Sequence, residues 1–187
     1  MKVISVNVGR AETHLIGGRR IATAIGKRAV DGPVSVGPLG LEGDEQADPS
    51  VHGGRSKAVY AYPAQHYAFW RTVRAQARVA GWDDALPFGA VGENLTLEGL
   101  DEAALWIGDR LVLPGCVLAV TEPRQPCFKF DAAMGFAQAS RLMVQSGYCG
   151  SYLAVVEPGT VRAGDAIRLE AGPRELGIRE LFRARRR

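Results

Sequence analysis

KAVYAYPAQHYAFWRTVRAQARVAG, residues 57–81, places a strand pattern directly before a helix pattern. Its first six residues, 57–62, mix β-branched, aromatic and small side chains, which is typical of a β-strand. After Pro63, apolar side chains recur at three- and four-residue spacing, which predicts an amphipathic helix over residues 64–80. A proline at the start and Gly81 after the end match the preferences of helix termini. The segment therefore predicts a strand that leads into one packed helix.

Short β-like runs recur along the rest of the chain, separated by many of its 23 glycines and 10 prolines. Many short strands with turn signals between them are typical of a β-barrel or β-sandwich core. A second, weaker helix is expected at about residues 136–145. We therefore predict a mainly β, α+β fold, in which a few helices pack against a β-barrel core. The further runs assigned to strands are residues 3–8, 34–36, 111–113, 117–121, 152–156 and 166–169.

The bulk composition limits the number of domains and the class of protein. A chain of 187 residues with 47% hydrophobic and 23% charged residues is expected to form one globular domain. We place this domain at residues 1–170 and a short basic extension at residues 171–187. The net charge of +3 is too small to indicate a nucleic-acid partner, and much of it lies in the basic extension. No signal peptide or membrane span is visible, which favours a cytoplasmic protein without a membrane partner.

The cysteines argue against both a disulfide framework and a structural zinc site. There are three of them, so at least one cannot form a disulfide within the chain. None stands in a CxxC pair, and no histidine lies at zinc-finger spacing from any of them. A reducing cytoplasm, where thiols persist, fits this pattern.

One cysteine stands in an unusual setting, EPRQPCFKF, residues 122–130. Two prolines stiffen the backbone before Cys127, because each fixes its own φ angle. Arg124 and Lys129 flank the cysteine, and nearby cations favour the thiolate, which is the form that attacks or binds a metal. The alternative is a small buried cysteine in a proline-rich turn, which is the commoner case. On this segment alone both interpretations stay open.

Two further segments carry polar residues in glycine-rich turns. His52, Gly53 and Gly54 precede Lys57, and paired glycines let backbone N–H groups approach an anion closely. A charged turn between two strands is the plainer interpretation. Residues 92–100, GENLTLEGL, include Asn94, and here a polar loop that enters a strand fits equally well.

Taken together and in order, these segments resemble the MOSC domain family, named for the C-terminal domain of molybdenum cofactor sulfurase, and most closely its YiiM-like stand-alone bacterial branch. The resemblance covers about residues 1–170. The matching stretches are AIGKRAV (24–30), GLEGDEQAD (40–48), VHGG (51–54), KAVYAYPAQHYAFW (57–70), GENLTLEGL (92–100), IGDR (107–110), PRQPCFK (123–129) and SGYCGSYLAVVEPGTVRAGD (146–165).

The resemblance implies a β-barrel-like fold that binds the molybdenum cofactor, a pterin whose dithiolene holds the metal. The cysteine that the family offers as a molybdenum ligand corresponds to Cys127, and a soft thiolate suits such a site. The family's His-Gly-Gly motif falls on residues 52–54. Its basic residues near the cofactor's phosphate correspond to Lys57 and Arg124, and Asn94 stands in its GEN motif. Pyridoxal phosphate binding is a further property attributed to the family.

The resemblance also implies an activity, the reduction of N-hydroxylated small molecules such as 6-hydroxylaminopurine to amines. Electrons would come from a separate reductase, because the chain has no ferredoxin-type cysteine cluster. His52 would either donate a proton or orient the cofactor. The alternative is a cofactor carrier or sulfur-transfer module, in which Cys127 parks the cofactor or holds a persulfide. A third alternative is a thiol protein whose metal site has decayed.

Two departures from the stand-alone branch affect these expectations. Its members often continue into a helical C-terminal segment, whereas this sequence stops at Arg187. Whether the protein closes over its substrate and whether it forms a homodimer therefore stay open questions. Ser151 stands where relatives often carry tryptophan, which alters packing or a pocket wall.

Overall fold

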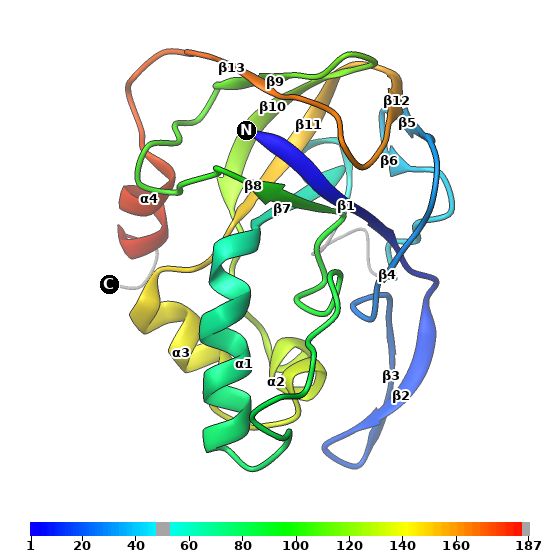
Figure 1. Cartoon of the computed structure of the whole chain (residues 1–187), viewed down its shortest axis with the longest axis vertical. Helices are drawn as coiled ribbons and strands as arrows, with labels where there is room; N and C mark the ends of the chain where they lie inside the picture. Colours follow the sequence, from blue (N-terminus) through cyan, green and yellow to red (C-terminus); the bar gives the residue numbers. More distant parts are fainter. Residues whose placement is uncertain (48–52, 185–187) are drawn as a thin grey trace.

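An eight-stranded sheet runs through the centre of the molecule, as the computed structural model shows over the residues it describes, 1–47 and 53–184 (Figure 1). The strand order is β13-β9-β10-β11-β7-β8-β1-β4, and every neighbouring pair is antiparallel except β7 and β8. The mixed architecture confirms the predicted α+β class. The strands of this sheet are β1 (Lys2–Val8), β4 (Arg28–Ala29), β7 (Val59–Pro63), β8 (Leu95–Glu98), β9 (Arg110–Val112), β10 (Val117–Pro123), β11 (Ser151–Glu157) and β13 (Arg168–Glu170).

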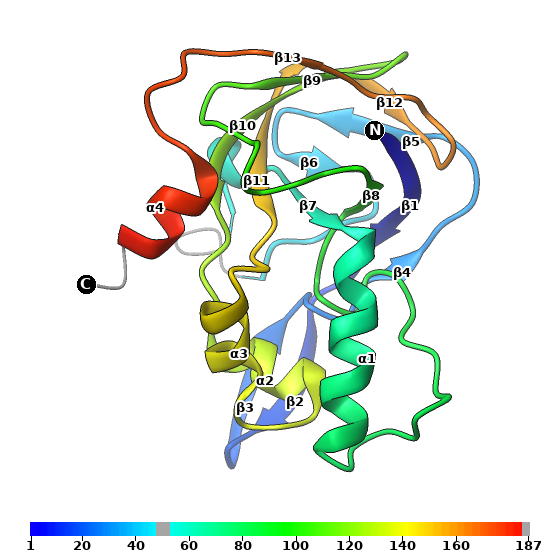
Figure 2. The same ribbon diagram turned by 60° about the vertical axis from the view of Figure 1, so that its left-hand side comes forward.

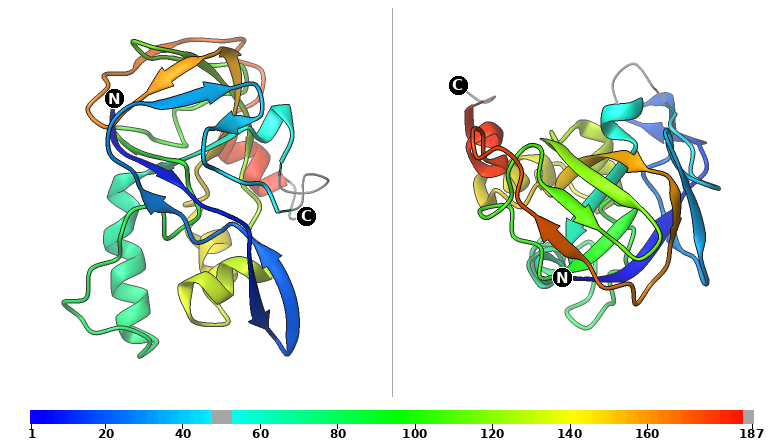
Figure 3. Two further views of the ribbon diagram at one scale, coloured as in Figure 1. Left: turned by 90° about the vertical axis from the view of Figure 1, so that its right-hand side faces the viewer. Right: turned by 90° about the horizontal axis from the view of Figure 1, so that it is seen from above.

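Two smaller ladders lie beside this sheet. β12 (Gly159–Val161), β5 (Val34–Gly37) and β6 (Gly40–Leu41) form one of them. β2 (Glu12–Ile16) and β3 (Arg19–Thr23) form a hairpin that projects from the body of the molecule (Figures 1 and 3). Gly17 and Gly18 make its two-residue turn with φ angles of 56° and 77°, which is the conformation that tight hairpins require. Sequence reasoning missed this hairpin.

The predicted β-barrel core does not close into a complete barrel among the described residues. Viewed from above, the sheet curls strongly around the core (Figure 3), but among the described residues β13 and β4 remain its two edges. β1 is nevertheless joined to the segment before β13, by an isolated bridge between Lys2 and Ala166 and by three backbone hydrogen bonds between residues 1–3 and residues 164–167. The curled sheet therefore comes close to closing, but β1 and β13 do not form a ladder with each other.

The strand and helix predicted at residues 57–80 are both present, with shifted ends. Lys57 belongs to a short 3₁₀ turn, η1 (Arg55–Lys57), so β7 begins two residues later than predicted. A second turn, η2 (Ala64–His66), leads into α1 (Tyr67–Gln76). The helix ends before its predicted boundary because Arg78 adopts a left-handed φ of 58°, which an α-helix cannot accommodate.

Three more helices cover the sheet. The second predicted helix corresponds to α3 (Ala139–Ser146), which ends at Gly147 in a left-handed C-cap. α2 (Phe128–Met134) was not predicted, and it begins directly after Cys127. α1, α2 and α3 gather at one end of the sheet (Figures 1 and 2). The longest α-helix in the described part of the chain has 10 residues, and no helix there could cross a membrane.

α4 (Ile178–Ala184) lies in the predicted basic extension and packs onto the sheet. Ile178 and Phe182 are buried in the same hydrophobic core as the central strands. Arg174 donates to the buried Asp109 carboxylate at 2.8 Å, so the segment before α4 is also tied to the sheet. The described part of the extension therefore contributes to the core.

Trp70 of α1 fixes the position of α2. Its indole Nε1 donates to the Tyr62 hydroxyl of β7 at 2.6 Å. Its ring meets the ring of Phe130 in α2 edge-to-face, with centroids 5.1 Å apart. All three side chains are fully buried, and large buried aromatic side chains dominate core energetics. This packing holds α2, and therefore the residue before it, against the central strand.

Candidate functional site

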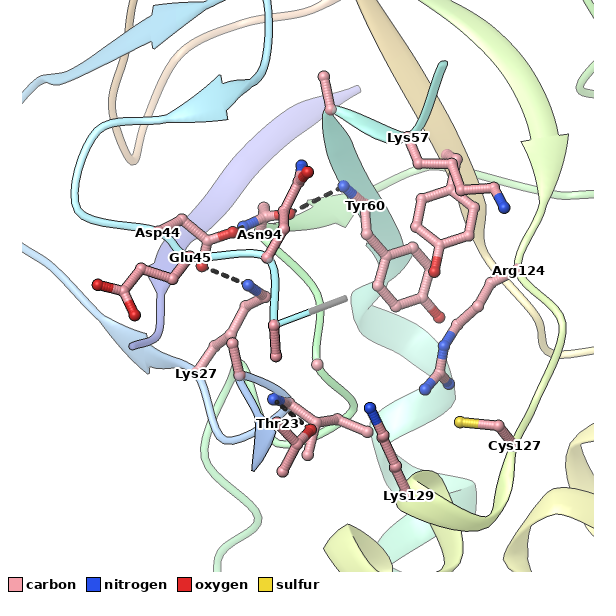
Figure 4. Close-up of a pocket in the computed structure, with 17 residues that line it drawn as sticks. Thr23, Lys27, Asp44, Glu45, Lys57, Tyr60, Asn94, Arg124, Cys127 and Lys129 are labelled. Atoms are coloured by element: carbon pink, nitrogen blue, oxygen red, sulfur yellow. Dashed lines mark hydrogen bonds and ion pairs between the residues drawn. The ribbon is translucent and has the colours of Figure 1, made fainter. Parts of the chain in front are cut away.

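A cavity opens to solvent between the sheet, the β2–β3 hairpin and α2 (Figure 4). It is lined by residues from the loops after β3 and β6, from β7, from the loop before β8, and from the connection between β10 and α2. Because these five segments converge on one open cavity, we take it as the candidate small-molecule site.

Cys127 lies in the wall of this cavity, on a backbone that its neighbours hold firmly. The residue is extended, with φ −139° and ψ 169°, and directly precedes α2. Its carbonyl oxygen accepts hydrogen bonds from Phe130 N at 2.8 Å and from Ser140 Oγ of α3 at 3.0 Å. The side chain is half-buried, and all three cysteines of the chain are reduced. The thiol is therefore positioned by two helices and faces an open cavity.

Arg124 places a buried positive charge beside this thiol. Its guanidinium carbon lies 4.7 Å from the ring centroid of Phe130 and 5.3 Å from that of Tyr60. Nη1 contacts Met143 Sδ at 3.7 Å, and the residue is only 5% exposed. Among the residues that the structure describes, no carboxylate lies within ion-pair distance of it.

The two tyrosines near Arg124 cannot neutralise its charge. Tyr60 lies on β7 and Tyr152 on β11, and their rings are 5.3 Å apart. Burial raises the pKa of both phenols above the ordinary value, so both are neutral at pH 7 and offer only dipoles. A buried cation without an anionic partner is unfavourable. The arrangement therefore favours an anion at this end of the cavity.

A second cation, Lys27, forms a buried ion pair in the opposite wall. Its ammonium contacts Asp44 Oδ1, and the Lys27 and Asp44 side chains are 8% and 7% exposed. Asp44 also accepts from Gly9 N and from Asn94 Nδ2, both at 2.8 Å. Burial lowers the pKa of the Lys27 amine, and the Asp44 charge opposes this shift.

Asn94 connects this ion pair to the central sheet. Its Oδ1 accepts from Tyr60 N at 3.0 Å, and its Nδ2 also donates to Asn7 O at 3.3 Å. The residue stands directly before β8, where β7 and β8 run parallel. The amide thereby joins the start of β8 to β7 and β1 and aims its remaining donor at Asp44.

Two more lysines lie at the cavity. Lys57 Nζ is 3.8 Å from Glu122 Oε1 and 5.8 Å from the centroid of the Tyr152 ring. Lys129, in the first turn of α2, donates to Ala22 O of the hairpin at 3.3 Å. With Lys27 and Arg124, these residues give the cavity a predominantly cationic lining.

The glycines of the predicted nest lie outside this lining. Gly53 and Gly54 do not border the cavity. Gly54 N donates at 2.9 Å to Gln46 Oε1, a residue that does border it. Gly54 has φ 82°, a conformation that favours glycine. His52, the predicted proton donor, lies outside the described residues.

The structure thus gathers four predicted residues in one cavity, namely Cys127, Arg124, Lys57 and Asn94. Sequence reasoning assigned no role to Lys27 or Asp44. Both lie in stretches that carry the family resemblance, but nothing in the sequence shows that they form a buried pair. Tyr60 and Tyr152 lie in stretches that were predicted as strands and were not assigned to a site.

A metal held only by protein side chains is not suited to this cavity. In the described part of the chain, no three histidine, cysteine, aspartate or glutamate residues come together in a way that could hold a metal ion. Cys127 would therefore be a single protein ligand, and most other ligands would have to come from a bound group.

Comparisons with known proteins find relatives over most of the chain. The family model described as "MOSC domain" matches residues 48–168. "Uncharacterized protein YflK" of Bacillus subtilis is 39% identical over 167 residues, which are 89% of this chain and 72% of that protein. A protein named "Reductase" from Gibberella moniliformis is 34% identical over 188 residues, which cover 98% of this chain but 32% of that protein.

Among solved structures, YiiM from Geobacillus stearothermophilus is similar throughout. It superposes with a TM-score of 0.76 at 30% identity and covers 97% of this chain and 81% of its own. Pyridoxal phosphate binding finds no support in these comparisons.

Proposed function

The chain belongs to the MOSC domain family, and we propose that it is a molybdenum-cofactor-dependent reductase that converts N-hydroxylated small molecules, such as 6-hydroxylaminopurine, to amines. Family membership supports the link to the molybdenum cofactor. The similarity to a protein named "Reductase" supports the reaction type. The chemistry of the cavity supports both.

The residues of the cavity fit this cofactor. The cofactor brings its own dithiolene sulfurs to the metal, so the protein needs to add few ligands, and Cys127 offers one soft thiolate. The cofactor is also an anion, which suits the buried charge of Arg124. When bound, the cofactor supplies the redox centre that exchanges electrons and an oxygen atom.

The side chains of the protein bind and orient the reactants. Arg124 would bind an anionic group of the cofactor through charge-assisted hydrogen bonds, which are the stronger class. Lys57 and Lys129 add positive charge at the edges of the cavity. The extended backbone of Cys127, held by α2 and α3, fixes the direction of its sulfur before a ligand arrives, which is a requirement of a precise site.

The overall reaction is R–NHOH + 2 e⁻ + 2 H⁺ → R–NH₂ + H₂O. The N–O bond breaks, and the oxygen leaves as water. The electrons would come from a separate reductase. His52 stays a predicted proton donor or cofactor-orienting residue, and its substitution by alanine tests both roles.

The observation that carries this proposal is the buried Arg124 guanidinium beside the Cys127 thiol in one open cavity. The test uses protein purified from a host that makes the cofactor and from a matched host that does not. We expect dithionite-dependent reduction of 6-hydroxylaminopurine only in the first preparation. Equal activity in both preparations would contradict a cofactor-dependent reaction.

The alternative is a cofactor carrier or sulfur-transfer module. The open mouth of the cavity is compatible with handing a bound group to another protein. A preparation that contains molybdenum but reduces no N-hydroxylated compound would favour this alternative. A carrier should also tolerate His52→Ala, whereas a reductase that uses this histidine as an acid should lose activity.

A further inference from the structure

We propose that Lys27 is a catalytic residue that donates a proton to the oxygen of the substrate's N–O bond. This inference rests on the proposed function and deepens it, because reduction of an N-hydroxylated compound requires two protons. In Figure 4, Lys27 lies across the cavity from Cys127. A substrate bound between them would have Cys127, the proposed metal ligand, on one side and the Lys27 ammonium on the other.

The position of Lys27 is fixed by contacts that extend to strands β1 and β7. Its ammonium pairs with Asp44, whose other contacts are with Gly9 N and Asn94 Nδ2. Asn94 is itself held by Tyr60 N of β7 and the Asn7 carbonyl of β1. A proton donor must be held in position before the substrate arrives, and these contacts do so for Lys27.

The ammonium keeps donors available for a ligand. An ammonium group has three N–H donors. Over residues 1–47 and 53–184, Asp44 is the single hydrogen-bond acceptor of Lys27. Two donors therefore remain, and the side chain borders the cavity. They can reach an oxygen atom that enters it.

The other cationic and phenolic groups of the cavity are less suited to this task. Arg124 is not deprotonated in proteins. Tyr60 and Tyr152 are weak acids at pH 7 because burial raises the pKa of both. Lys57, 26% exposed, and Lys129, half-buried and bonded to Ala22 O of the hairpin, are held in less enclosed positions than Lys27.

The electrostatic surroundings of Lys27 favour proton release without removing its charge. Burial lowers the pKa of its amine, while the carboxylate of Asp44 and, more weakly, Glu93 oppose this shift. Asp44 and Glu45 face it from the segment after β6, and Glu93 lies buried before β8. An acid whose pKa is nearer to neutrality than that of ordinary lysine transfers its proton more readily.

The proton transfer balances as follows. Two electrons enter from a low-potential donor, which is dithionite in the assay, and the N–O bond breaks. The departing oxygen already carries its hydroxyl hydrogen, so one proton from Lys27 Nζ completes the water molecule that leaves. The nitrogen keeps the electron pair of the broken N–O bond and takes the second proton from solvent, which completes the amine. Lys27 regains its proton from solvent through the open mouth of the cavity.

The test compares Lys27→Met, Lys27→Arg and a control, Lys2→Met, at an exposed lysine of β1 away from the cavity. General acid catalysis contributes about 10²–10⁴-fold, so Lys27→Met should lower kcat by about that factor. KM and molybdenum content should change little, and Lys2→Met should match the wild type. The wild-type kcat should fall as pH rises through the pKa of Lys27. Lys27→Arg should lose this limb of the pH profile, because arginine does not titrate there.

Lys27→Met leaves Asp44 buried without its cation, so the variant could unfold. The double variant Lys27→Met/Asp44→Asn removes both charges together, which is better tolerated than removing one, and it should fold and show the same loss of kcat. A measurement without turnover complements it. ¹⁵N NMR of the cofactor-free protein should give a Lys27 pKa below the ordinary value of about 10.4, and Asp44→Asn should lower it further.

The outcomes separate this role from the proposed function. An active wild type together with unchanged kcat in the folded double variant would overturn the role of Lys27 alone. So would a Lys27 pKa at or above the ordinary value. A wild type that holds molybdenum but reduces no N-hydroxylated compound would overturn the proposed function, and this role with it.

Discussion

Replacing Arg124 by methionine should separate binding from stability. Arg124 is 5% exposed and has no carboxylate within ion-pair distance in the described part of the chain. The substitution loses two cation–π contacts, at 4.7 and 5.3 Å, each worth about 0.5–2 kcal/mol. It also removes the desolvation penalty of a buried ion, which is several kcal/mol. The two effects largely cancel in the protein without a ligand.

We therefore expect the free energy of unfolding of cofactor-free Arg124→Met to lie between that of the wild type and about 2 kcal/mol above it. A flexible methionine also keeps contact with the aromatic rings. In protein from a cofactor-producing host, by contrast, the molybdenum content should fall to a small fraction of the wild-type value. The loss follows because the anion then lacks its buried counter-charge.

Urea unfolding followed by circular dichroism measures the first quantity, and metal analysis measures the second. Arg141→Met, on the exposed face of α3, is the control and should leave both unchanged. A cofactor-free Arg124→Met that is destabilised by more than about 2 kcal/mol would show that Arg124 is a structural cation. Full molybdenum content in this variant would show that its charge has no role in binding.

Two further predictions concern residues around the cavity. Asn94→Ala leaves the Tyr60 N–H without its buried acceptor and removes one of the donors to Asp44, so urea unfolding should show a loss of about 1–3 kcal/mol; a loss under 0.5 kcal/mol would contradict the role of Asn94 in joining β7, β8 and Asp44. Cys116→Ala and Cys149→Ala should each cost about 1 kcal/mol and keep activity. Both thiols are buried, and burial raises the pKa of Cys116 to about 11 and that of Cys149 still further. A folded but inactive Cys149→Ala would show that a second thiol takes part.

The elements that the sequence predicted best are those whose pattern is local. The strand and helix at residues 57–80 follow from side-chain periodicity, and their ends shifted because backbone conformations at Lys57 and Arg78 are not visible in that periodicity. α2 is short and begins within a proline-rich segment that offers no repeating apolar pattern. The predicted β-barrel core is approached but not closed by a ladder, since the curled sheet meets residues 164–167 only through an isolated bridge and a few backbone hydrogen bonds. Side-chain periodicity does not show how the ends of a sheet meet.

The residues of the site also divide into those with a local sequence signal and those that come together only in the fold. Cys127, Arg124, Lys57 and Asn94 could be selected because their motifs are unusual or match a family. Lys27 and Asp44 are 17 residues apart in the chain and form a pair only after folding. Neither residue type is informative by itself, since most lysines and aspartates are exposed. Burial gives this pair its significance, and burial could not be assigned before the fold was known.

The central claim, that Cys127 binds the metal of a molybdenum cofactor, is tested most directly by the molybdenum content of Cys127→Ser. Wild-type protein from a cofactor-producing host should contain about one molybdenum per chain, in keeping with one soft thiolate ligand. Cys127→Ser should lose most of the metal while its circular dichroism spectrum and unfolding midpoint stay close to those of the wild type. A folded Cys127→Ser that retains the full wild-type content would contradict the claim.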